Sequence, residues 1–127
     1  MFKCPVYSSK ALADILNHPH AYRMPAMTEI PIPNTTVMLE GQKLRWKEFE
    51  ITFYYFPGQT LYHEALLVKH KNGESILFIG DSFSPSGMDD YCLLNRNFIH
   101  PGKGYLYCLN FLRKLPENTW LIWHEQR

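Results

Sequence analysis

The chain has 127 residues, and 46% of them are hydrophobic, which is enough for one domain over residues 1–127 with a packed core. Its net charge of +1 gives no electrostatic reason to expect a nucleic-acid partner, and no run of about 18 to 20 apolar residues could cross a membrane. Cys4, Cys92 and Cys108 are too widely spaced for a zinc ribbon or a disulfide framework. We therefore expect reduced thiols and, since the first residues show no signal-peptide pattern, a cytoplasmic protein.

A short helix is predicted near the N-terminus. Ser8 is a suitable N-cap, and the apolar residues between positions 10 and 16 recur at helical spacing. The helix should end before Pro19, because the residue preceding a proline avoids helical backbone angles. His18 and His20 lie in the loop that follows, where no further ligand pattern surrounds them, so we interpret them as ordinary surface histidines.

A series of strands is predicted after a proline-rich connection. Apolar and aromatic residues are concentrated in short runs that turn-forming residues separate. The predicted strands are residues 35–39, 44–46, 49–56, 64–68 and 75–79. The short connections favour a mostly antiparallel meander.

The last two of these strands should form a hairpin that turns at Asn72-Gly73, since Asn-Gly between apolar runs is the strongest short hairpin signal. A three-residue loop would pair His70 with Glu74 and place His63 opposite Asp81 on the same face. A two-residue loop would place His63 and Asp81 diagonally. In either register, a histidine and an aspartate meet at the open end of the hairpin.

Two interpretations fit such a pair. The first is a structural hydrogen bond between a histidine and an aspartate at the end of a strand. The second is a metal site, because neutral imidazole and carboxylate are both suitable ligands for zinc, iron or manganese.

The C-terminal third should contain two helices and one strand. A polar loop over residues 82–87 leads to a short helix opened by Asp89-Asp90, whose carboxylates suit a helix N-terminus. Residues 101–104 form a turn without the spacing of a phosphate loop. A helix over residues 105–115 then ends at Pro116, and a buried strand over residues 120–123 leads to His124.

The arrangement of Pro57-Gly58-Gln59-Thr60, an apolar hairpin and Gly80-Asp81 resembles the metallo-β-lactamase superfamily. In that family, Pro-Gly-His-Thr-x-x-His precedes a hairpin that ends in Phe-x-Gly-Asp. The resemblance implies that Asp81 bridges two metal ions as a catalytic residue, that His63 is a ligand or the partner of one, and that His124 holds the second metal. It also implies that Gln59, Thr60 and Ser82 contact the ligands or the substrate.

Two features depart from the family pattern. Gln59 stands where the family has its first, ligating histidine, and the His-x-His-x-Asp-His motif that supplies most of the ligands is absent. The family domain is also about twice as long. We therefore expect an α+β fold that is half of an αββα sandwich, with a mainly antiparallel sheet and flanking helices. The chain would be either a C-terminal fragment or a natural short protein, and its end directly after His124 favours the fragment.

These observations lead to two functional hypotheses. The first is the C-terminal part of a metal-dependent hydrolase, in which zinc or another divalent metal activates water to attack an ester, lactam, thioester or phosphodiester in a small-molecule substrate. This chain alone should then hold no metal and have no activity. The alternative is a non-catalytic interaction domain in which His63, Asp81 and His124 are structural polar groups. In both cases an uncovered apolar sheet face should cause homo-oligomerisation.

Overall fold

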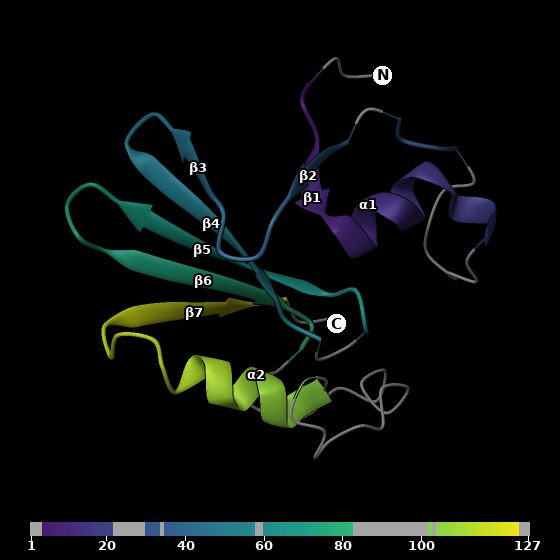
Figure 1. The fold of residues 1–127 in the computed structure, drawn as a ribbon. Coiled ribbons are helices and arrows are strands. Elements are labelled where there is room, and N and C mark those ends of the chain that lie inside the picture. The colour runs from purple at the N-terminus through teal and green to yellow at the C-terminus, as the bar shows by residue number, and fades with distance from the viewer. Residues whose placement is uncertain are drawn as a thin grey trace.

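The computed structural model describes residues 4–21, 30–33, 35–57, 60–82, 102 and 104–124. In these ranges the chain forms a two-stranded sheet, a five-stranded sheet and flanking helices (Figure 1). The elements in chain order are β1 (Tyr7–Ser9), α1 (Lys10–Asn17), the 3-10 helix η1 (Pro19–Ala21), β2 (Thr36–Met38), β3 (Lys43–Trp46), β4 (Phe49–Tyr55), β5 (Glu64–His70), β6 (Ser75–Gly80), α2 (Gly104–Leu112) and β7 (Thr119–Trp123). No helix in the described part is long and apolar enough to span a membrane.

The N-terminal elements differ from the prediction in two respects. The N-cap of α1 is Ser9, whose hydroxyl accepts a hydrogen bond from the amide of Leu12 at 3.3 Å, so the predicted cap at Ser8 was one residue early. Ser8 instead belongs to β1, an unpredicted strand that pairs in parallel with β2. The predicted strand at residues 35–39 therefore exists, but it lies in a separate sheet and is not the first strand of the meander.

The five-stranded sheet has the order β3-β4-β5-β6-β7. Its first four strands form an antiparallel meander, as predicted, while β7 is parallel to β6. Because parallel neighbours cannot be joined by a tight turn, the chain crosses over between them, and α2 lies in this crossover. The sheet is therefore mainly antiparallel with one parallel edge strand.

The register of the β5–β6 hairpin is the one expected for a three-residue loop. Leu66 pairs with Phe78, and Lys69 pairs with Ser75. The amide of His70 donates to the carbonyl oxygen of Glu74 at 2.9 Å. The loop contains Gly73 at a φ of +96°, a conformation that glycine adopts without a steric cost. The predicted turn at Asn72-Gly73 is confirmed.

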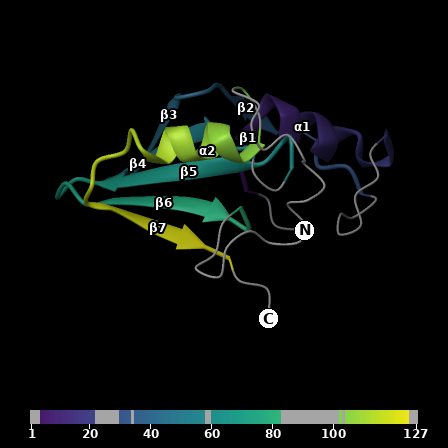
Figure 2. The same cartoon turned by 90° about the horizontal axis from the view of Figure 1, so that it is seen from below.

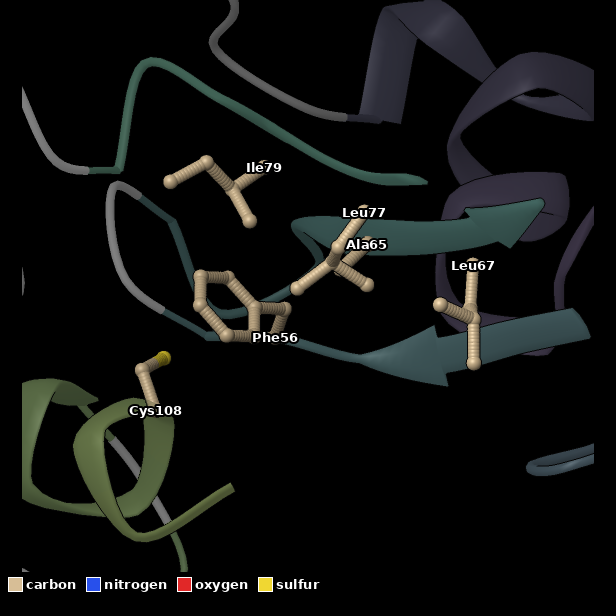
Figure 3. Close-up of a cluster of buried hydrophobic side chains, with 6 residues drawn as sticks. All are labelled: Phe56, Ala65, Leu67, Leu77, Ile79 and Cys108. Atoms are coloured by element: carbon tan, nitrogen blue, oxygen red, sulfur yellow. The ribbon is translucent and has the colours of Figure 1, made fainter. Parts of the chain in front are cut away.

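The core lies between one face of this sheet and α2. Figures 1 and 2 show α2 along one side of the sheet. Figure 3 shows the buried cluster in this space: Phe56, Ala65, Leu67, Leu77, Ile79 and Cys108. Phe111 of α2 adds ring contacts to Tyr54 and Phe56, with centroid distances of 4.8 Å and 5.9 Å. Burial of these side chains, at roughly 25 cal/mol per Å² of apolar surface, holds the helix on the sheet.

Two predictions for the C-terminal part are corrected. The helix predicted over residues 105–115 ends at Leu112, and the following residues form turns up to Pro116. The strand before His124 was expected to be buried, but Trp120 is 68% exposed and the three residues after it are also exposed. The reason is that β7 is an edge strand, so it has a neighbouring strand only on the β6 side. The helix predicted at Asp89-Asp90 lies outside the described residues.

Candidate functional site

The ends of β6 and β7 bring Asp81 and His124 together. After a register shift between Phe78 and Gly80, the parallel pairing continues with Gly80 opposite Trp123. The amide of His124 then donates to the carbonyl oxygen of Gly80 at 2.9 Å. This backbone hydrogen bond places the two residues that follow the strands side by side.

Asp81 and His124 form a hydrogen-bonded pair, with 2.7 Å between Nδ1 of His124 and Oδ1 of Asp81. Because an ionised carboxylate only accepts hydrogen bonds, the proton of this bond comes from Nδ1 of His124. The side chain of Asp81 is 13% exposed and that of His124 is 68% exposed. The mostly buried carboxylate therefore orients an accessible imidazole, as carboxylates do for histidines that bind metals or transfer protons.

His63 has a second set of contacts. Its Nδ1 lies 3.2 Å from the carbonyl oxygen of Phe56 and 3.2 Å from Oγ of Ser82, a fully buried residue. A carbonyl oxygen can only accept, so Nδ1 of His63 carries a proton and Nε2 of the neutral ring is the unprotonated nitrogen. Burial lowers the pKa of His63, and the Phe56 carbonyl and the charges of Asp81 and Glu64 oppose this shift only in part. His63 is therefore neutral at pH 7.

Gly80 is in direct contact with the ring of His63. A Cβ atom built on Gly80 would lie 2.6 Å from Nε2 of His63, which is closer than real Cβ atoms come to other heavy atoms. Gly80 also has a φ of +54°, in the left-handed region that favours glycine. The glycine before Asp81 thus makes room for the imidazole.

A cavity of about 420 Å³ lies beside His63, on the side of the sheet where β1 packs against β4. Thr60, His63 and Glu64 contribute its polar lining, and Phe53 and Leu66 are among its apolar lining. Within the described residues, the buried Oγ1 of Thr60 has no hydrogen-bond partner. Glu64 is engaged with β1, since its Oε1 accepts from the hydroxyl of Ser8 and the amide of Ser9, both at 2.9 Å.

Comparison with known proteins gives structural matches only; no family model and no curated protein sequence matches the chain. A mutant metallo-β-lactamase of Cronobacter sakazakii with a HARLDQ motif matches with a TM-score of 0.65 and 15% identity, over 93% of this chain and 46% of that protein. A class B3 di-zinc metallo-β-lactamase from an Alaskan soil metagenome matches with a TM-score of 0.60 and 12% identity, over 93% of this chain and 47% of that one. A β-lactamase from Chitinophaga pinensis matches with a TM-score of 0.57 and 15% identity, over 93% and 47%.

The chain has a metallo-β-lactamase-like fold. The predicted α+β class and the resemblance to this superfamily are therefore confirmed. The chain spans about half the length of the structures that it matches.

Within this metallo-β-lactamase-like fold, the three predicted metal ligands divide into two groups. The hairpin brings His63 and Asp81 to the same end of the sheet, and the charge of Asp81 acts on the pKa of His63. However, Nδ1 of His63 bonds Phe56 and Ser82, while Oδ1 of Asp81 bonds His124. Ser82, predicted to contact a ligand or substrate, contacts His63. Gln59 lies outside the described residues.

The donor set does not make a complete metal site by itself. Among the residues that the structure describes, no group of three or more His, Cys, Asp or Glu side chains could hold a metal ion. A structural zinc needs four protein ligands, and a catalytic zinc usually needs three. The described residues alone therefore do not fit a catalytic metal, and the metal-binding roles of His63, Asp81 and His124 stay predictions.

Sequence reasoning did not find three contacts of this site: the Phe56 carbonyl, the hydrogen bonds of Glu64 to β1, and the packing of Gly80 on His63. Backbone carbonyls carry no sequence signal, and the other two contacts depend on how separate segments come together. Only the contact of Gly80 with His63 had a sequence signal, because a glycine directly before a candidate ligand often marks a place where another group lies close to the backbone.

Proposed function

We propose that this chain is the C-terminal part of a metal-dependent hydrolase domain that acts on a small molecule with an ester, lactam, thioester or phosphodiester bond. The observation that carries the proposal is the Asp81–His124 pair, which lies at the ends of adjacent strands in a metallo-β-lactamase-like fold. A partly buried carboxylate bonded to an accessible imidazole is a common element of metal and acid–base sites.

In this proposal the chain supplies only some of the ligands. His124 would present Nε2 to the metal, and Asp81 would hold that ring and share in binding. His63 would be a ligand or a group that supports the ligands, and its Nε2 lies against Gly80 in this structure. Thr60, Ser82 and Gln59 would support these groups or contact the substrate. The remaining ligands would come from the half of the domain that the matched structures have and this chain does not span.

The first test compares two polypeptides: the 127-residue chain and a version extended by the upstream coding region. We expect the 127 residues to purify without stoichiometric zinc and to show no hydrolysis above the buffer rate. The extended version should bind zinc and hydrolyse a chromogenic ester or lactam. A His-x-His-x-Asp-His motif within on the order of 100 residues upstream, about the length of a small domain, would agree with this expectation.

The residue test is Asp81→Ala in the extended version, which should lower the zinc content and reduce hydrolysis by about a hundredfold, the upper end of the cost of losing a group that orients a metal ligand. Asp14→Ala is a matched control, because Asp14 makes the same kind of bond to His18 at 3.2 Å on the surface of α1. The control should change neither quantity. Equal effects of both substitutions, or stoichiometric zinc on the 127 residues alone, would contradict the proposal.

The second candidate function is a non-catalytic interaction domain with an altered metal site. It is favoured by the absence of a three-ligand group among the described residues and by the structural contacts of His63. An extended version that binds no zinc and hydrolyses none of these substrates would support this second function.

A further inference from the structure

The strand register places an unusual set of side chains on the sheet face opposite α2. Directly paired residues point to the same face of a sheet, so the pairings define cross-strand rows. One row is Leu44, Ile51, Val68, Ile76 and Trp120. The neighbouring row on one side is Trp46, Phe49 and His70, of which Trp46 is the most exposed, and the row on the other side includes Phe78 and Ile122. We call the central row together with Trp46, Phe78 and Ile122 the open face; these eight residues are apolar, and His70 lies at its margin.

The opposite face has a different character. Ala65, Leu67 and Leu77 lie there beneath α2 and belong to the buried core. A polar row on the same side contains Arg45, Glu50, Lys69, Ser75 and Thr119. On one face, α2 therefore covers an apolar core that has charged residues beside it. On the other face, the central row is apolar from β3 to β7.

Much of the open face is accessible within the described part of the molecule. Its most exposed members are Trp120 (68%), Trp46 (57%), Ile122 (44%) and Phe78 (42%), and they lie on three different strands. β1 packs against β4 on this side of the sheet, near Phe53, which is buried. The exposed residues thus belong to an apolar sheet face that β1 and α1 cover at one end only.

The apolar area of the open face is large enough for a small protein–protein interface. A fully exposed aromatic side chain presents roughly 150–250 Å², so the open face offers on the order of 500 Å² of apolar surface. This is near the upper end for the largest patch on a monomeric protein, roughly 300–600 Å². Two such faces in contact would bury on the order of 1,000 Å², which is near the lower limit for a specific interface.

The chemistry of the open face selects the partner. Its eight side chains carry no charge, and the nearest cationic groups, His70 and the Lys47 ammonium 5.4 Å from the Trp46 ring, lie at one margin, so the face favours an apolar partner over a nucleic acid or a charged peptide. An apolar sheet face is complementary to another such face, and two sheets pack about 10 Å apart with their side chains interdigitated. A second copy brings an identical face, and a two-fold axis makes one apolar patch serve both partners.

We propose that two copies of this chain associate through their open faces, sheet on sheet, in a two-fold dimer with a dissociation constant in the micromolar range. The dimer is measured on the 127-residue chain without metal, so its failure would not be a failure of the hydrolase function. In a domain completed as proposed above, the other half of the sandwich would cover the open face in place of the second copy.

The test uses sedimentation velocity and light scattering from about 1 to 100 µM, a range that brackets such a constant. The key variant is Ile122→Lys, which puts a charge into the buried interface and should weaken dimerisation at least tenfold. Leu121→Lys is the matched control: Leu121 lies on the same strand, points to the opposite face and is 39% exposed, compared with 44% for Ile122. This control should dimerise as the wild type does, and circular dichroism should show that both variants are folded.

Three results would overturn the proposal. The first is a wild-type monomer throughout this range. The second is equal weakening by the two lysine variants, which would point to pairing along the edge of β7. The third is a dimer that neither substitution affects. Phe78→Lys on the adjacent strand gives an independent variant of the same face, and it should behave as Ile122→Lys does.

Discussion

At the scale of single residues, His63 is the group whose charge depends most clearly on folding. Burial lowers its pKa in the folded state, while in the unfolded chain the pKa is about 6.5. The unfolded chain therefore binds a proton more readily than the folded protein as the pH falls below about 6.5. The stability that neutral His63 contributes is fully present above this pH and is lost as the pH falls toward the folded-state pKa.

We expect the free energy of unfolding to fall by at most about 1.4 kcal/mol per pH unit from this group in that window. Chemical denaturation between pH 5 and 8 measures it. His63→Gln should remove this part of the pH dependence, whereas His20→Gln, at an exposed position, should retain it. An unchanged pH profile in His63→Gln would show that His63 does not resist protonation in the folded state.

Gly80 gives a second prediction at this scale. Gly80→Ala puts a methyl group 2.6 Å from Nε2 of His63 and strains a backbone at φ +54°. Gly41→Ala is a control for the strain alone, since Gly41 has a φ of +72° and a Cβ there would meet no atom within 4 Å. We expect Gly80→Ala to lower the free energy of unfolding by about 1–3 kcal/mol more than Gly41→Ala, the usual cost of overpacking.

Urea denaturation measures both variants. NMR of the imidazole resonances should show a displaced His63 in Gly80→Ala only, because the ring must move from Phe56 and Ser82 to admit the methyl group. Equal destabilisation by the two variants would mean that the contact with His63 adds nothing.

At the scale of elements, the sequence predicted what local signals determine. The Asn72-Gly73 turn set the register of β5 and β6, and the short connections set the meander. The three-residue strand β1 was missed because it is too short to show a period-2 pattern and pairs with a distant segment. β7 was expected to be buried because a continuous apolar run is typical of strands covered on both faces. The same run occurs here on an exposed edge.

For the candidate site, too, the sequence predicted where the residues lie but not which groups they contact. His63, Asp81 and His124 were predicted to lie at one end of the sheet from strand ends and from a family resemblance. Their individual partners could not be predicted, because they depend on a register shift before Gly80 and on the return of the chain from Phe56 to His63. The amide of Phe56 donates to the carbonyl oxygen of His63 at 3.0 Å, which closes this loop and places the imidazole against Ser82.

At the scale of the whole molecule, the described part forms two layers around the core: α2 and one face of the five-stranded sheet (Figures 1 and 2). A sheet with apolar residues on both faces is normally covered on both. Here the second face is covered near Phe53 and exposed at Trp46, Phe78, Trp120 and Ile122. If a second copy covers it, folding and association are linked by mass action.

This linkage predicts that the thermal midpoint of the wild-type chain rises with protein concentration. A tenfold rise in concentration changes the free energy of a dimer by about 1.4 kcal/mol, shared by two chains, which corresponds to roughly 2–3 °C for a domain of this size. Differential scanning calorimetry at about 10 and 100 µM measures the shift, with concentrations chosen around a micromolar dissociation constant. Ile122→Lys should show a smaller shift with concentration, since it dimerises more weakly, while Leu121→Lys should keep the full dependence. A wild-type midpoint that is independent of concentration would mean that the stability of this chain does not rest on a second copy.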